Sequence, residues 1–239
     1  MMTLNRKLVW LTLFSIAMGF MESAVVVYLR EIYYPNGFSF PLVPIENKIA
    51  LVEFLREAAT IIMLFGIGML TGKTAAQRFA FFIYCFAIWD LFYYVFLKML
   101  MDWPASFMTW DILFLIPVPW VGPVITPCLV SLTMILLALA IVVFQERGIN
   151  TQLKWKDWTW FILGSFIIIT SFVWDYFLYV GKVNSKSTIW TLSSDNSMFQ
   201  DIRTYIPAEF NWTLFVLGEF ILLMGIMFYI RRIRAVSMA

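Results

Sequence analysis

Six long runs of apolar residues dominate the chain, and short polar segments separate them. A helix needs about 20 apolar residues to cross a hydrocarbon core about 30 Å thick, and each run reaches that length. The runs are continuous rather than alternating, which favours helices over membrane-spanning strands. We therefore predict an all-α integral membrane protein with about six transmembrane helices, at approximately 8–29, 48–71, 78–99, 121–144, 158–180 and 209–230.

Lysine and arginine are distributed unevenly around these runs. If the N-terminus lies inside, ten of the 17 basic residues fall in short cytoplasmic segments and seven fall in longer outer loops. Basic residues concentrate in the cytoplasmic loops of membrane proteins. The first run follows Arg6 and Lys7 and continues to Tyr28, so we expect an uncleaved helix rather than a signal peptide. This pattern predicts a multi-pass protein of the bacterial inner membrane with both termini in the cytoplasm.

Two segments of the chain resemble each other closely. Residues 89–95 read WDLFYYV and residues 174–180 read WDYFLYV. Each is followed by a loop containing tryptophan and then by an Ile-Pro pair, Ile116–Pro117 or Ile206–Pro207. The first hairpin is a weaker match, with Glu22 in the place of the aspartate. We predict three parallel two-helix repeats, at about 8–71, 78–144 and 158–230, within a single transmembrane domain covering 1–239.

The segment between the third and fourth runs is apolar but rich in proline. Pro117, Pro119 and Pro123 forbid a continuous helix through it. A short helix at about 106–116, lying in the membrane interface or re-entering it, accounts for both features.

Five acidic residues fall inside the predicted spans. A charge at the centre of a bilayer costs about 3 kcal/mol even on lenient scales, so these side chains must face the bundle interior, a wet cavity or each other. Crowded carboxylates suit general acid–base chemistry, proton coupling or cation binding. The candidate catalytic residues are Glu22, Glu57, Asp90, Asp175 and Glu219.

Four basic residues lie close to these acids in the sequence and are candidate binding residues: Arg30, Arg56, Lys98 and Lys182. Arg30, Lys98 and Lys182 each follow an acid by seven or eight residues, which places them on about the same helix face. The structural alternative is that these bases simply neutralise the acids. Glu53, Arg56 and Glu57 have the spacing of a local ion-pair ladder.

Aromatic residues accompany the two aspartates. Tyr94 and Tyr179 each follow an aspartate by four residues, where a phenol can donate to the carboxylate or can belong to an interfacial aromatic belt. Trp89 and Trp174 directly precede the aspartates. With the acids, these side chains suggest an aromatic-walled cavity on the outer side.

The composition excludes several classes of chemistry. Histidine is absent, which excludes histidine-ligated haem and HExxH zinc sites; metal dependence is otherwise open. The net charge is only +2 and there is no basic run, so we expect no nucleic-acid partner. Only 13% of residues are charged, about half the usual fraction, which leaves the lipid bilayer as the expected surroundings. Other subunits are not indicated either way.

A Trp-Asp pair in one helix and a Pro-x-Glu opening the next, Pro207-Ala208-Glu209 and Pro44-Ile45-Glu46, resembles the small membrane-bound carotenoid and terpene cyclases. The resemblance implies acids that protonate an isoprenoid and aromatic walls that stabilise carbocations. Pro117-Val118-Pro119 lacks the acid, and the paired glutamates of that family are absent. Over its whole length, the chain resembles an uncharacterised family of bacterial multi-pass inner-membrane proteins.

Three functions remain open at this point. The first is binding of, or action on, a lipid or isoprenoid by the outer-half carboxylates, with Asp90 and Asp175 as acid and base. The second is a proton- or cation-coupled transporter, although the cytoplasmic halves of the spans are almost free of polar residues. The third is an accessory or assembly subunit of a membrane complex.

Overall fold

The computed structural model describes residues 3–43, 45–114, 118–183 and 204–237. Two features predicted from the sequence lie partly outside these ranges. The Ile116–Pro117 pair of the second repeat is one, and the outer loop of the third repeat at 184–203 is the other.

The described residues form six long helices and one two-stranded sheet. The helices are α1 (Leu4–Tyr33), α2 (Asn47–Thr71), α3 (Ala75–Met101), α4 (Ile125–Glu146), α5 (Trp155–Val183) and α7 (Trp212–Ser237). Five of them, α1, α3, α4, α5 and α7, are long and apolar enough to cross a membrane. These five helices indicate a helical membrane protein, as the sequence predicted.

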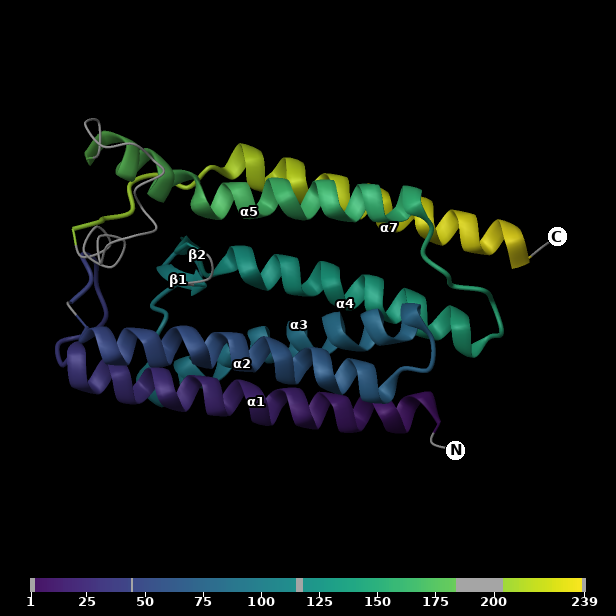
Figure 1. The fold of residues 1–239 in the computed structure, drawn as a ribbon, viewed down its shortest axis with the longest axis horizontal. Helices are drawn as coiled ribbons and strands as arrows, with labels where there is room; N and C mark the ends of the chain where they lie inside the picture. Colours follow the sequence, from purple (N-terminus) through teal and green to yellow (C-terminus); the bar gives the residue numbers. More distant parts are fainter. Residues whose placement is uncertain (1–2, 44, 115–117, 184–203, 238–239) are drawn as a thin grey trace.

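The helices run along one common direction, and α1 begins and α7 ends at the same end of the bundle (Figure 1). Helices α1 and α2 both pack on α3, α3 packs on α4, and α5 packs on α7. Helix α4 also contacts α7 and so connects the two groups. The core between the helices is apolar and includes Leu64, Phe81, Ile141, Phe215 and Ile233.

Small residues allow the closest helix contacts. Ser15, Gly19 and Ser23 lie at four-residue spacing on the buried face of α1. The Ser23 hydroxyl lies within hydrogen-bonding distance of both the Gly19 carbonyl oxygen at 2.8 Å and the Tyr93 carbonyl oxygen of α3 at 3.0 Å. A Cβ atom on Gly19 would lie 3.0 Å from the Trp89 carbonyl oxygen, so a larger residue here would require α3 to shift by a few tenths of an ångström. Stripes of small residues are typical of helices packed within membranes.

The predicted short helix at 106–116 is wrong. Residues Trp110–Phe114 form strand β1, which pairs antiparallel with β2 (Trp120–Pro123). Prolines are tolerated at the edges of sheets, and both strands of a two-stranded sheet are edges. The hairpin lies toward the end of the bundle opposite the start of α1, beside the start of α4 (Figure 1), and β2 packs on α5 and α4.

Candidate functional site

A cavity of about 210 Å³ lies between α1, α2, α3 and strand β1. Its apolar walls come from all these elements and from the connection between α1 and α2. Its polar lining contains two arginines, Arg30 and Arg56, and five acidic residues, Glu22, Glu53, Glu57, Asp90 and Asp111. Three of the five predicted intramembrane acids therefore meet at one cavity, together with both predicted arginines.

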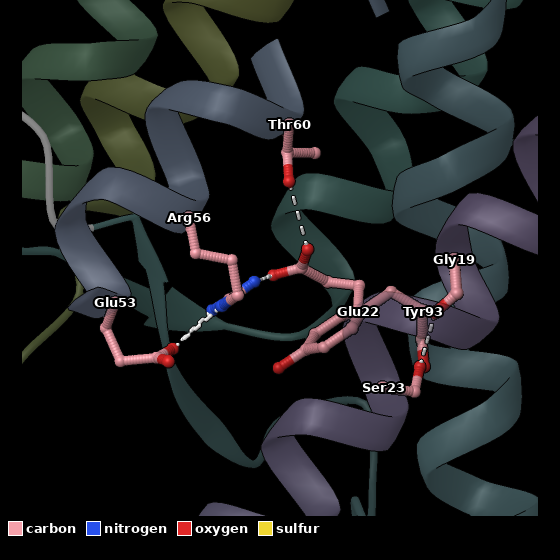
Figure 2. A network of polar contacts seen from close by, with 7 residues as sticks. All are labelled: Gly19, Glu22, Ser23, Glu53, Arg56, Thr60 and Tyr93. Atoms are coloured by element: carbon pink, nitrogen blue, oxygen red, sulfur yellow. Dashed lines mark hydrogen bonds and ion pairs between the residues drawn. The ribbon is translucent and has the colours of Figure 1, made fainter. Parts of the chain in front are cut away.

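Arg56 joins α1 to α2 across the cavity (Figure 2). Its guanidinium forms an ion pair with Glu22 of α1 and donates to Glu53 of α2 through Nε at 2.9 Å and Nη2 at 2.6 Å. Thr60, one turn further along α2, donates to Glu22 at 3.4 Å. Because these three charged side chains are at most 21% exposed, the network is largely removed from water.

Arg30, near the C-terminal end of α1, is held at one end of the cavity by the β1–β2 hairpin and by the loops that carry Phe38 and Trp103. It forms an ion pair with Asp111 of β1 at 3.3 Å. The centre of its guanidinium lies 3.7 Å from the Trp103 ring and 4.3 Å from the Phe38 ring. Tyr94 donates to the other oxygen of Asp111 at 3.2 Å. The sequence suggested that Arg30 faces Glu22 and Tyr94 faces Asp90, but both side chains contact Asp111.

Asp90 lies on α3 between these two networks. It accepts a hydrogen bond from Ser131 of α4 at 2.8 Å and lies close enough to Asp111 for the two carboxylates to repel each other. The neighbouring Tyr93 phenol interacts electrostatically with both carboxylates and with both arginines of the cavity. Trp89 is 93% buried and lines the same wall. This wall combines a carboxylate, a phenol and an indole, as the 89–94 motif suggested.

Asp175, the aspartate of the second Trp-Asp pair, has different neighbours from Asp90. Asp175 accepts hydrogen bonds from the Tyr205 hydroxyl at 2.7 Å and from the backbone N–H groups of Ala208 and Glu209. It does not line the cavity, and its donors tie α5 to the segment that leads into α7. The hydroxyls of Tyr179 and Thr204 share a hydrogen bond of 2.6 Å. Trp174 is exposed.

The other predicted site residues also lie outside the cavity. Glu219 of α7 accepts from Thr133 of α4 at 2.8 Å, and its second oxygen is buried without a partner among the described residues. Lys98 pairs with the exposed Asp102 at 2.7 Å rather than with Asp90. Lys182 is exposed near the end of α5.

Asp111 was missed as a site residue because it lies in the segment expected to be an interfacial helix. Its only sequence signal is a charge placed between Trp110 and Ile112 in an apolar stretch. Asp111 belongs to the hairpin rather than to a spanning helix. Burial raises the pKa of Asp111 to about 6. The charge of Arg30 and the hydrogen bonds that Asp111 accepts lower the pKa, but by less than burial raises it. Burial likewise raises the pKa of Tyr34, which accepts a hydrogen bond from the Val43 N–H at the rim of the cavity.

The arrangement supports binding and proton exchange. Within the described residues, no group of three or more Asp, Glu or Cys side chains is placed to hold a metal ion. The cavity is smaller than the 300–1,000 Å³ of typical drug-sized ligand sites, so it suits the polar end of an amphiphile. Buried carboxylates in such a site can donate or accept a proton.

The helices and this cavity define the class, a helical membrane protein with a carboxylate-lined site. In comparisons with known proteins, no family model, no curated protein and no solved structure matches the chain.

Proposed function

We propose that this multi-pass membrane protein binds the polar end of a lipid or isoprenoid in the cavity between α1, α2 and α3. Asp90, together with Glu57 and Glu22, is positioned to exchange a proton with the bound molecule. The observation that carries the proposal is the combination in one cavity of apolar walls and five carboxylates. A wholly water-soluble ligand would not need the apolar walls, and a purely structural contact would not need the five carboxylates.

The proposed topology has six spans, with α2 as the sixth, and places both termini in the cytoplasm of a bacterial cell. The cavity then lies in the outer half of the inner membrane. The distribution of lysine and arginine supports this orientation, and the shared end of α1 and α7 is consistent with an even number of spans.

The three-repeat organisation remains part of the proposal. Its support is that the acid on the first helix of each unit receives a hydrogen bond from the second half of that unit. Thr60 donates to Glu22, Ser131 to Asp90 and Tyr205 to Asp175. The units would share this contact, although only the first two place their acid in the cavity.

Proton- or cation-coupled transport is less well supported. Transport needs a route to the other side of the membrane, and the part of the bundle nearer the start of α1 is filled by apolar side chains such as Leu11, Phe81 and Ile141. A binding site accessible from one side agrees better with this packing.

Photo-crosslinking tests the proposal. The protein in lipid nanodiscs is irradiated with diazirine-bearing lipid and isoprenoid analogues, and the labelled peptides are mapped. We expect labelling to concentrate in peptides covering 22–60 and 89–114. Val26→Trp fills the cavity and should abolish this labelling, whereas Val9→Trp, at an exposed position of the same helix, should not.

The crosslinking experiment can also refute the proposal. Labelling spread evenly over all helices, or unchanged by Val26→Trp, would refute a lipid-binding cavity. The accessory-subunit alternative would then take its place.

A further inference from the structure

The charges that line the cavity are strongly unbalanced. Five acidic residues face two arginines, an excess of three acids over bases. In a largely dehydrated site, like charges repel strongly, and a bound countercharge relieves the repulsion. The repulsion between Asp90 and Asp111 is one instance of this imbalance.

Both arginines are already committed to carboxylates of the protein. Arg56 is held by Glu22 and Glu53, and Arg30 by Asp111. The Arg30 guanidinium also lies against the rings of Phe38 and Trp103. A phosphate or diphosphate group would have to displace one of these carboxylates, and it would enter a site with excess negative charge. The cavity is therefore poorly suited to an anionic head group.

Aromatic rings supply the second half of the recognition chemistry. Trp89, Tyr93 and Tyr94 of α3 line the wall that carries Asp90, and Phe114 of β1 also lines the cavity. Aromatic faces attract organic cations, and the attraction increases when water is excluded. The carboxylates are not placed to form a three-ligand metal site within the described part of the chain.

We propose that the cavity selects an amphiphile with an organic ammonium head over an alcohol or a phosphate on the same chain. This inference rests on the proposed function and specifies the chemical class of its ligand. The ammonium group lies against Asp90 and the aromatic rings of α3, while the hydrocarbon chain follows the apolar wall. No covalent step is required.

Calorimetric titration with three probes of equal chain length tests this selectivity: hexyltrimethylammonium, hexanol and hexyl phosphate. The protein is kept in dodecyl maltoside micelles, and heats from empty micelles are subtracted. We expect the ammonium probe to bind about ten-fold more tightly than hexanol, and hexyl phosphate to bind most weakly.

Variants locate the effect. Asp90→Asn should weaken binding of the ammonium probe by about ten-fold and leave hexanol binding nearly unchanged. Glu57→Gln, on the opposite wall, should act in the same direction and serves as a second variant if the first does not fold. Asp175→Asn is the matched control, since it makes the same change in the repeated Trp-Asp pair but outside the cavity.

The titration results distinguish a failure of ammonium selectivity from a failure of the proposed binding site. Equal binding of the ammonium probe and hexanol overturns charge selection but leaves an amphiphile site standing. Tightest binding of hexyl phosphate, or an unchanged ammonium affinity in folded Asp90→Asn and Glu57→Gln, also overturns the selection. If none of the probes binds, the inference and the proposed function fail together.

Discussion

Replacement of Arg56 by methionine is the most informative change that the structure suggests. The guanidinium is the only basic group in the described network that links Glu22 to Glu53 (Figure 2). Methionine has a similar length and fills the same space without charge. The change therefore leaves two carboxylates facing each other with little access to water.

The expected loss follows from the burial of the three side chains. Removing one partner of a fully buried ion pair costs about 3–5 kcal/mol. Here Arg56 is 21% exposed, and Glu22 and Glu53 are 12% and 10% exposed, so water screens part of the remaining charge. We therefore expect Arg56→Met to lower the free energy of unfolding by about 2–3 kcal/mol. Arg56→Lys keeps the charge but loses the forked geometry, and should cost about 1 kcal/mol.

Reversible unfolding in mixed micelles with an increasing fraction of dodecyl sulfate measures this change. The 11 tryptophans of the chain give a strong fluorescence signal. Glu22→Gln added to Arg56→Met should recover part of the loss, because it removes one of the two orphaned charges. Arg231→Met, at an exposed position near the end of α7, is the control and should change little.

Two results would refute this reasoning. One is a loss for Arg56→Met no larger than that for Arg231→Met. The other is a further loss, rather than a recovery, when Glu22→Gln is added. Either would mean that the acids are satisfied without the arginine, and that it does not hold α1 to α2.

Three further predictions follow from other parts of the structure. Gly218→Ala should lower the free energy of unfolding by about 1–3 kcal/mol, since its Cβ would lie 2.6 Å from a side-chain atom of α5. Gly66→Ala should raise the free energy of unfolding by about 0.5–1 kcal/mol, since its Cβ would meet no described atom beyond its chain neighbours and the nearby backbone of its own helix. The pKa of Asp111 is raised from 3.8 to about 6, so its contribution to the free energy of unfolding is complete below pH 3.8 and is lost as the pH rises through about 6. The free energy of unfolding, measured from about pH 4 to 7, should therefore change less with pH in Asp111→Asn than in the unchanged protein. In intact bacteria, an impermeant maleimide should label Ser39→Cys but not Asn150→Cys, and the reverse pattern would overturn the proposed orientation.

The helices could be predicted from the sequence because a long apolar run is an unambiguous signal. The run at 48–71 corresponds to α2 at Asn47–Thr71, and the run at 78–99 to α3 at Ala75–Met101. The observed helices extend a few residues beyond most of the runs. This difference is expected because a helix can continue past the hydrocarbon core, where polar residues are tolerated.

The hairpin could not be predicted in the same way. The prolines in 117–123 exclude a helix there, but they do not indicate which structure precedes them. Strand β1 exists because 110–114 finds a partner in 120–123, and a pairing of this kind is a tertiary contact rather than a local preference. The local sign of a strand is the β-propensity of Trp110, Ile112 and Phe114.

The candidate site was predicted in part. Depth within the span identified Glu22, Glu57 and Asp90, since an acid inside a membrane must face the interior. Depth does not determine which side of a helix faces which neighbour. The same criterion therefore also selected Asp175, which joins α5 to the segment 205–209, and Glu219, which joins α7 to α4. Which acids line the cavity depends on how α1 and α2 pack on α3, and this packing cannot be predicted from the sequence pattern.

The pairing of Arg30 with Asp111 has a consequence for how the protein is made. The two residues are 81 positions apart, so the ribosome completes α1, α2 and α3 before the partner of Arg30 emerges. Until then, the C-terminal end of α1 carries a cation whose native anion has not yet been synthesised. The cavity can therefore be completed only after strand β1 has been synthesised, because Asp111 and its neighbours supply part of its lining.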